Sequence, residues 1–351
     1  MRVLSVRALS ALVVLLFASS ASAVTMAWTP IGDPGNPADT EVMTDGTTGY
    51  GSVPYAYSIG TYEVTNGQYA EFLNAKAKSD PFELYDSRMA PSLFGGIMRT
   101  GSSGNYAYST YAGRENTPVN WLTVYNAMRF VNWMNNGQGN SDTETGAYTL
   151  IGGTAVPNNF VTARNPGATI VLPTENEWYK AAYYDPVSAS YFDYPVGLDA
   201  QTGCATPNPT ANQANCNGAV SDMTIVGSYA SSASPYGTFD QGGNGQEWLE
   251  TLYPNGPNGP DARVARGGGL FSLPDTLASS SRSSRFSAVK GNSTGFRVAM
   301  IPEPSTGLLV IAGLLGLTRS VCASVDRLPS AARAARLRPA RLRVSLISRH
   351  R

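Results

Sequence analysis

Three long stretches rich in Gly, Asn, Ser and Pro interrupt this chain, and they limit the helices and strands between them to short elements. The stretches lie at roughly 92–118, 136–168 and 187–220. With 36 Gly and 23 Pro among 351 residues, and only 14% charged residues, the composition favours an irregular protein over a helical bundle. No repeat of roughly 20–50 residues recurs, so neither a solenoid nor a propeller is predicted.

Three segments between these stretches have helical patterns. In EVTNGQYAEFLNA, Thr65 and Gln68 form a capping box ahead of an apolar face. In LPTENEWYKAAYYDP, Thr174 and Glu177 form a second capping box, and an Asp-Pro pair ends the helix. TPVNWLTVYNAMRFVNWMNNG has apolar residues at helical spacing and closes on Asn-Gly.

Short apolar segments bounded by turn residues predict brief strands. They are YSIGTYEV, ATIVLPT, MTIVGSY and GFRVAMI. Helices in the first half and short strands among long loops later predict a single α+β domain.

The formal net charge of zero conceals an asymmetry. Residues 24–318 carry 14 Lys and Arg against 24 Asp and Glu, a net of −10, whereas the residues from Arg319 onward hold nine Arg and one acid, Asp326. Nucleic-acid binding requires a basic face that neutralises phosphates, so the acidic body argues against nucleic acid as a partner.

The first 23 residues resemble a secretory signal peptide. Arg2 and Arg7 precede the apolar run ALSALVVLLFA, and the small residues Ala-Ser-Ala precede Val24. We therefore expect residues 1–23 to be removed on export. A retained membrane helix is the alternative, although the apolar run is short for one.

The supply of histidine and cysteine restricts the chemistry. The one histidine is His350, which excludes Ser-His-Asp and Cys-His catalysis and His-ligated metals in the body. Cys204 and Cys216 flank a Pro- and Asn-rich loop, and they could form one small disulfide or remain two free thiols. Cys322 has no obvious partner.

Six motifs in order give the body a family resemblance. They are YEVTNGQYAEFLNA, TPVNWLTVYNAMRFVNWMN, LPTENEWYKAA, GTFDQGGNGQEW, RVARGGG and GFRVA, from about Ile59 to Ala299. Together they resemble the sulfatase-modifying-factor domain of the formylglycine-generating enzymes. The resemblance implies, for residues 24–300, a single irregular, loop-rich α+β domain related to C-type lectins.

The end of the chain has a second resemblance. IPEPSTGLLVIAGLLGLTR runs from Ile301 to Arg319; its residues 301–318 look like a PEP-CTERM sorting signal, and an Arg-rich tail follows at 319–351. The apolar run is short for a full span, and the arginines after it would stay cytoplasmic. The resemblance implies transient membrane anchoring, an exosortase-type sorting peptidase as partner, and a final location in the envelope, at the cell surface or in the extracellular matrix. An ordinary membrane anchor is the alternative.

The loop after RVARGGG is where the family's oxidising members place two cysteines that hold copper. Aligned on the glycines, those positions fall on Ser272 and Leu277. A hydroxyl and an alkyl group cannot replace thiolates, so no copper is expected. The family's iron-dependent sulfoxide synthases need histidines that the body lacks. A phosphate loop is also unsupported, because no Lys-Ser or Lys-Thr follows the glycines.

The resemblance places a calcium site in FDQGGNGQEW. Its ligands would be Asp240, Gly243, Gly245 and Glu247, which supply the hard oxygen donors that Ca²⁺ prefers. A glycine turn with solvated acids is the alternative.

A second calcium site of the family falls on ANCNGAVSDMTIVG. Asn215 and Asp222 would contribute side chains, and Cys216 and Thr224 would contribute carbonyls. Both ions would be structural, since binding to the folded chain alone adds to its stability.

Two further groups of residues have structural and functional interpretations. Arg266 and Arg297, from the RGG and GFR motifs, are expected to anchor buried carboxylates such as Glu63 or Glu177. The tyrosines of GNYAYSTYAGREN and YYDPVSASYFDYP could line a sugar- or peptide-binding cleft, or pack their own loops.

Two functions follow from the sequence. The first is an exported, non-catalytic, calcium-stabilised protein that binds a polysaccharide or protein ligand. The alternative is an oxidase that generates formylglycine from a cysteine of a sulfatase-type substrate, which would have to use Cys204 and Cys216.

Overall fold

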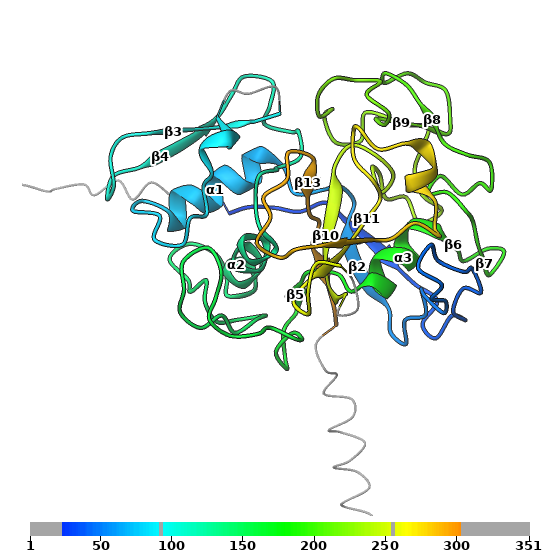
Figure 1. Cartoon of the computed structure of the whole chain (residues 1–351), viewed down its shortest axis with the longest axis horizontal. Helices are drawn as coiled ribbons and strands as arrows, with labels where there is room; N and C mark the ends of the chain where they lie inside the picture. Colours follow the sequence, from blue (N-terminus) through cyan, green and yellow to red (C-terminus); the bar gives the residue numbers. More distant parts are fainter. Residues whose placement is uncertain (1–22, 91–93, 254–256, 303–351) are drawn as a thin grey trace, which may run out of the picture. The chain divides into compact units, whose positions relative to one another are not determined.

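The computed structural model describes residues 23–90, 94–253 and 257–302 (Figure 1). These residues belong to one compact unit, Met1–Glu303. Nearly all of the predicted signal peptide, the predicted sorting segment beyond Pro302, and the Arg-rich tail lie outside the described residues. In the ranges that are described, no helix is both long and apolar enough to cross a membrane.

The predicted fold class, a loop-rich single α+β domain, is confirmed. The described residues form three α-helices, two short 3-10 helices and fourteen strands. The helices are α1 (Asn66–Lys76), α2 (Val124–Asn135) and α3 (Glu175–Tyr183), with 3-10 turns at Ser87–Met89 and Pro274–Leu277. The strands are β1 (Trp28–Ile31), β2 (Tyr57–Gly60), β3 (Ile97–Thr100), β4 (Ala107–Thr110), β5 (Ile170–Val171), β6 (Tyr184–Asp185), β7 (Ser190–Tyr191), β8 (Gly203–Cys204), β9 (Gln213–Ala214), β10 (Gln246–Leu252), β11 (Arg263–Arg266), β12 (Ser283–Arg285), β13 (Thr294–Gly295) and β14 (Ala299–Met300).

Two four-stranded sheets organise the domain. One has the order β1-β2-β14-β5 and joins the start of the described chain to its end. The other has the order β12-β11-β10-β13, in which β10 and β13 run parallel and the other neighbours run antiparallel. In Figure 1, α1, α2 and the β3–β4 hairpin lie on one side of β10 and β11, and the loops with β6 to β9 lie on the other.

All three predicted helices are present, and each begins with a capping box. The boxes at Thr65 and Thr174 are confirmed, with Gln68 and Glu177 as their reciprocal partners. The box of α2 was not predicted; there Thr123 accepts a hydrogen bond from the backbone of Asn126. Asparagine is a less familiar member of this motif than Glu or Gln.

The strand predictions were correct in part. YSIGTYEV contains β2, ATIVLPT contains β5, and GFRVAMI contains β14, whereas MTIVGSY forms no strand. There the backbone N–H of Thr224 is bound by the side chain of Asn244, 2.9 Å away, so a side chain takes the place of a strand partner. The first long loop contains the unpredicted β3–β4 hairpin.

Aromatic side chains make the centre of the main core. Phe130 of α2 contacts Phe72 of α1, Trp133 and Phe296, with ring centroids 5.3–5.8 Å apart among these neighbours. A second cluster forms where Trp178 and Tyr179 of α3 pack under β10 and β11. Trp248 of β10 belongs to the first cluster and Leu249 to the second, so the two clusters lie on opposite faces of this strand.

Candidate functional site

A buried ion pair crosses the centre of the candidate site. Nε and Nη2 of Arg297 each lie 2.6 Å from a different carboxylate oxygen of Glu247, and both side chains are fully buried. The indole N–H of Trp178 donates to the same carboxylate at 2.8 Å. Arg297 was expected to anchor a buried carboxylate such as Glu63 or Glu177; it does anchor one, and that carboxylate is Glu247. The reason is that β10 and the chain after β13 are neighbours in one sheet.

Two more carboxyl groups lie close to this ion pair. Asp240, with a φ of 58°, accepts a hydrogen bond from the backbone of Gly227 at 2.6 Å, and burial raises its pKa to about 6. Glu63 accepts one from the backbone of Gly245 at 3.2 Å, while its Oε2 is buried without a hydrogen-bond partner. Burial, and then the charge of Asp240, raise the pKa of Glu63 well above its usual range. Glu63 was not predicted to belong to this site.

The second predicted calcium set is also brought together. The amide of Asn215 donates to the carbonyl of Asp222 at 2.8 Å, and its Oδ1 is buried without a hydrogen-bond partner. The side chain of Asp222, in contrast, forms an ion pair with Arg114. Asn244 connects the set to the Gly-rich loop, because its Oδ1 accepts from the Thr224 backbone. The feature of the sequence that could have identified Asn244 is its position between two glycines.

The donor atoms fit a cation unequally in the two sets. In the described ranges, no group of three or more His, Cys, Asp or Glu side chains has the arrangement of a metal site. Both oxygens of Glu247 are already bound by Arg297 and Trp178. Oδ1 of Asn215, which has no hydrogen-bond partner, is the better donor to a cation. The carbonyls of Cys216 and Thr224, from the same predicted set, would have to complete the coordination shell.

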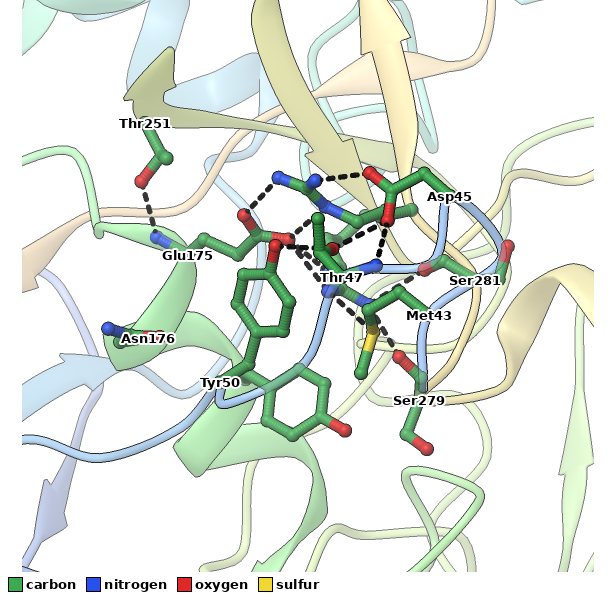
Figure 2. A network of polar contacts seen from close by, with 12 residues as sticks. Met43, Asp45, Thr47, Tyr50, Glu175, Asn176, Thr251, Ser279 and Ser281 are labelled. Carbon is green, nitrogen blue, oxygen red and sulfur yellow. Dashed lines mark hydrogen bonds and ion pairs between the residues drawn. The ribbon is translucent and has the colours of Figure 1, made fainter. Parts of the chain in front are cut away.

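The arginine of the RGG motif is held in a second charged network (Figure 2). Arg266 and Arg282 both bind the carboxylate of Glu175, at 2.7 Å for their closest approaches, and Arg282 reaches Asp45 at 2.5 Å. Arg266 also donates to two backbone carbonyls of the following loop, at 2.6 and 2.8 Å. The expected anchoring of Glu177 is instead made by Arg164, 3.0 Å away.

The loop that Arg266 supports begins with two glycines in the left-handed region. A Cβ at Gly267 would lie 2.7 Å from the carbonyl oxygen of Gln241, so only glycine fits there. Further along, the hydroxyl of Ser272 accepts from the backbone of Gly269 at 2.9 Å. Leu277 is fully buried and packs with Tyr194 and Cys216.

Comparison with known proteins identifies the family. The model of the sulfatase-modifying factor enzyme 1-like domain matches residues 43–301. The chain belongs to this family. A solved structure described as CarF has a TM-score of 0.53 and 19% identity, over 80% of this chain and 99% of that one, which supports the shared fold.

Curated relatives match shorter parts of the chain. Hercynine oxygenase of Mycolicibacterium smegmatis is 31% identical over 129 residues, 32% of this chain and 28% of that protein. Serine/threonine-protein kinase pkn1 of Chlamydia pneumoniae is 31% identical over 142 residues, 36% of this chain and 20% of that protein. The chain thus spans under a third of the length of these relatives.

Within the sulfatase-modifying-factor fold, Cys204 and Cys216 lie next to Leu277. Cys204 and Cys216 form a disulfide with Cα atoms 4.9 Å apart, which decides between the two alternatives left open by the sequence. The pair lies 61 and 73 residues before Leu277 in the chain, by subtraction of the residue numbers. In space it packs against that leucine. The disulfide therefore lies beside the position that the alignment assigns to a family cysteine.

The tyrosine-rich segments mostly pack their own loops. The hydroxyl of Tyr108 donates to the Ala77 carbonyl at 2.8 Å, and the ring of Tyr106 faces the guanidinium of Arg99. In the second segment, Tyr184 and Tyr191 are in ring contact at 4.9 Å. These contacts favour the packing interpretation over an aromatic cleft at these segments.

Proposed function

We propose that this chain is an exported, non-catalytic binding protein that uses the sulfatase-modifying-factor fold as a scaffold. The observation that carries the proposal is the packing of Leu277. Its buried alkyl side chain occupies the position that aligns with a family cysteine. Ser272, at the other aligned place, has its hydroxyl bound to the backbone of its own loop. Neither group supplies the soft donor that copper chemistry with oxygen needs.

A formylglycine-generating oxidase remains the second candidate, because the Cys204–Cys216 disulfide packs against Leu277. Reduction of that disulfide would give two thiols beside the aligned position. Cys216 is fully buried, and a buried thiol in apolar surroundings is a poor nucleophile. This burial favours a structural role for the bond.

Replacement of Cys216 by serine separates the two candidates. Opening a loop with a sequence separation of 12 residues should lower the free energy of unfolding by about 3 kcal/mol. We expect this loss in urea titrations, and we expect no oxygen consumption by either protein with copper and a cysteine-containing sulfatase peptide. Oxygen uptake by the parent that disappears in Cys216→Ser would establish the oxidase instead.

We also propose that a structural calcium ion binds at the Asn215 set. The support is the buried oxygen of Asn215 without a partner, since an unpaired buried polar atom costs about 1–3 kcal/mol unless a ligand or water satisfies it. The Asp240 set remains a weaker candidate, because Glu247 would have to exchange Arg297 for the ion.

Chelation tests the calcium proposal. Calcium at a concentration of 100 times its dissociation constant stabilises a folded protein by about 2.7 kcal/mol. Removal of the ion by EGTA should therefore lower the melting temperature by several degrees. We expect Asn215→Ala to melt lower than the parent in calcium and to respond no further to EGTA. Equal melting curves for the parent with calcium and with EGTA would contradict the proposal.

We propose export with cleavage before Val24, and the contacts of Val24 support this position. The side-chain amide of Gln138 accepts from the backbone N–H of Val24 at 2.7 Å and donates to its carbonyl at 2.8 Å. The Val24 side chain is buried, so the domain holds this residue while Ala23 is exposed. Cutting between them would leave the folded contacts intact and give an amino group that can still donate to Oε1 of Gln138.

N-terminal sequencing of the exported protein is the corresponding measurement. We expect Val24 as the first residue. Gln138→Ala should lower the free energy of unfolding by about 1–2 kcal/mol, since two backbone groups lose their partner. A mature protein that still begins at Met1 would contradict cleavage. We propose processing of the C-terminal signal by an exosortase-type peptidase on the resemblance alone.

A further inference from the structure

Two arginines on the second sheet differ from the other arginines in the described ranges. Of the ten arginines in the described ranges, eight form an ion pair with a carboxylate. The other two, Arg263 on β11 and Arg285 on β12, lie directly opposite each other in the antiparallel register. Like charges at opposed positions destabilise a sheet unless another group compensates them.

The two arginines differ in what they bind. Arg263 is fully buried, and its two Nη atoms donate to the backbone carbonyls of Glu250 and Val161. Arg285 is only half-buried, and its Nε donates to the side chain of Gln246. Arg285 is thus held by one hydrogen bond, and within the described ranges its two Nη atoms have no protein acceptor.

Arg285 is one of the residues around a groove of about 310 Å³ with polar and apolar walls. The residues that line it are Gln246, Asn258, Ser283, Ser284, Arg285, Phe286 and Val289. Asn258 donates to the carbonyl of Ser284 at 2.7 Å, which fixes its amide at the rim. Phe286 and Val289 are 45% and 40% exposed and provide an apolar platform beside the hydroxyl groups.

A polar atom without a partner lies next to the same arginine. The hydroxyl of Thr294 is fully buried and has no hydrogen-bond partner in the described structure. A Cβ at Gly291 would lie 2.5 Å from this hydroxyl and 3.5 Å from Nη1 of Arg285. The absence of a side chain at Gly291 therefore allows Thr294 and Arg285 to pack closely against this backbone.

We infer that this groove binds a carboxylate-bearing sugar, a uronate unit of a glycan, with the carboxylate on Arg285. A guanidinium edge matches a planar carboxylate with two parallel hydrogen bonds. The hydroxyl and amide groups of Ser283, Ser284 and Asn258 match sugar hydroxyls, and Phe286 offers a flat apolar face for the ring. This assignment rests on the proposed binding function and names its ligand class.

The probe is a trigalacturonate, compared with its methyl ester, which keeps the sugar hydroxyls but carries no charge. Binding is measured by titration calorimetry with the mature protein in calcium and ~0.15 M salt. At this ionic strength the charges of the acidic body are screened beyond about 8 Å. We expect the acid to bind at least tenfold more tightly than the ester. Arg285→Gln should reduce the affinity for the acid to that for the ester, with a melting temperature equal to or above that of the parent. Lys78→Gln removes one exposed positive charge elsewhere and should change nothing.

Phe286→Ala provides a second variant that an exposed position should tolerate. It should weaken both the acid and the ester several-fold, because it removes the platform and not the charge. Equal affinities for acid and ester, an unchanged affinity in Arg285→Gln, or tighter binding of a capped tri-aspartate peptide would each overturn the assignment. Oxidase activity or an absent response to EGTA would refute the proposed scaffold function without altering these titrations, so the two failures are distinguishable.

Discussion

Arg297→Met should lower the free energy of unfolding by about 4 kcal/mol, or prevent folding, because it leaves Glu247 charged and buried without its partner. Breaking a buried ion pair from one side costs about 3–5 kcal/mol. Here the arginine also donates to the backbone carbonyls of Gly60 and Phe239, each at 2.9 Å. Those carbonyls lose their donor together with the carboxylate.

The measurement is a urea titration followed by tryptophan fluorescence, since Trp178 contacts the same carboxylate. The double variant Arg297→Met with Glu247→Gln is the matched control. It removes both charges while Trp178 can still donate to the new amide, so it should recover part of the loss. A single variant within about 1 kcal/mol of the parent would show that this pair does not hold the sheet and the Gly-rich loop together.

Glu175→Gln should cost about 3 kcal/mol, the second largest effect, because two guanidinium groups share this one carboxylate (Figure 2). Arg266 is fully buried, and it would keep its backbone partners, the sulfur of Met43 and the ring of Tyr179. Arg282 would keep Asp45 and the ring of Tyr253. The substitution preserves shape, so the loss measures charge and hydrogen bonding.

Asp45→Asn is the control within the same network. The side chain of Asp45 is 23% exposed, against 2% for that of Glu175, and an ion pair nearer the surface contributes less, about 0–1 kcal/mol when it is exposed. We expect its urea midpoint to stay close to that of the parent, while that of Glu175→Gln falls clearly. Equal losses in the two variants would mean that burial does not set the strength of these ion pairs.

Local signals predicted the parts of this fold that depend on nearby residues. The capping boxes at Thr65 and Thr174 could be recognised because each involves residues three positions apart. The strand MTIVGSY was predicted wrongly, because its apolar composition does not reveal that a distant asparagine binds its backbone. Strands β10 and β11 were missed because buried Arg and Glu interrupt their apolar pattern.

The sequence by itself determined the family, the α+β class and the narrow supply of histidine and cysteine, since composition and ordered motifs carry that information without coordinates. Only the tertiary structure decided which partners the charged residues have. Arg297 binds Glu247, 50 positions away, and Arg266 binds Glu175, 91 positions away. It also placed the disulfide against Leu277 and, within the described ranges, left Arg285 without a carboxylate. Pairing across such separations depends on how irregular loops close around the sheets, and no local pattern encodes that closure.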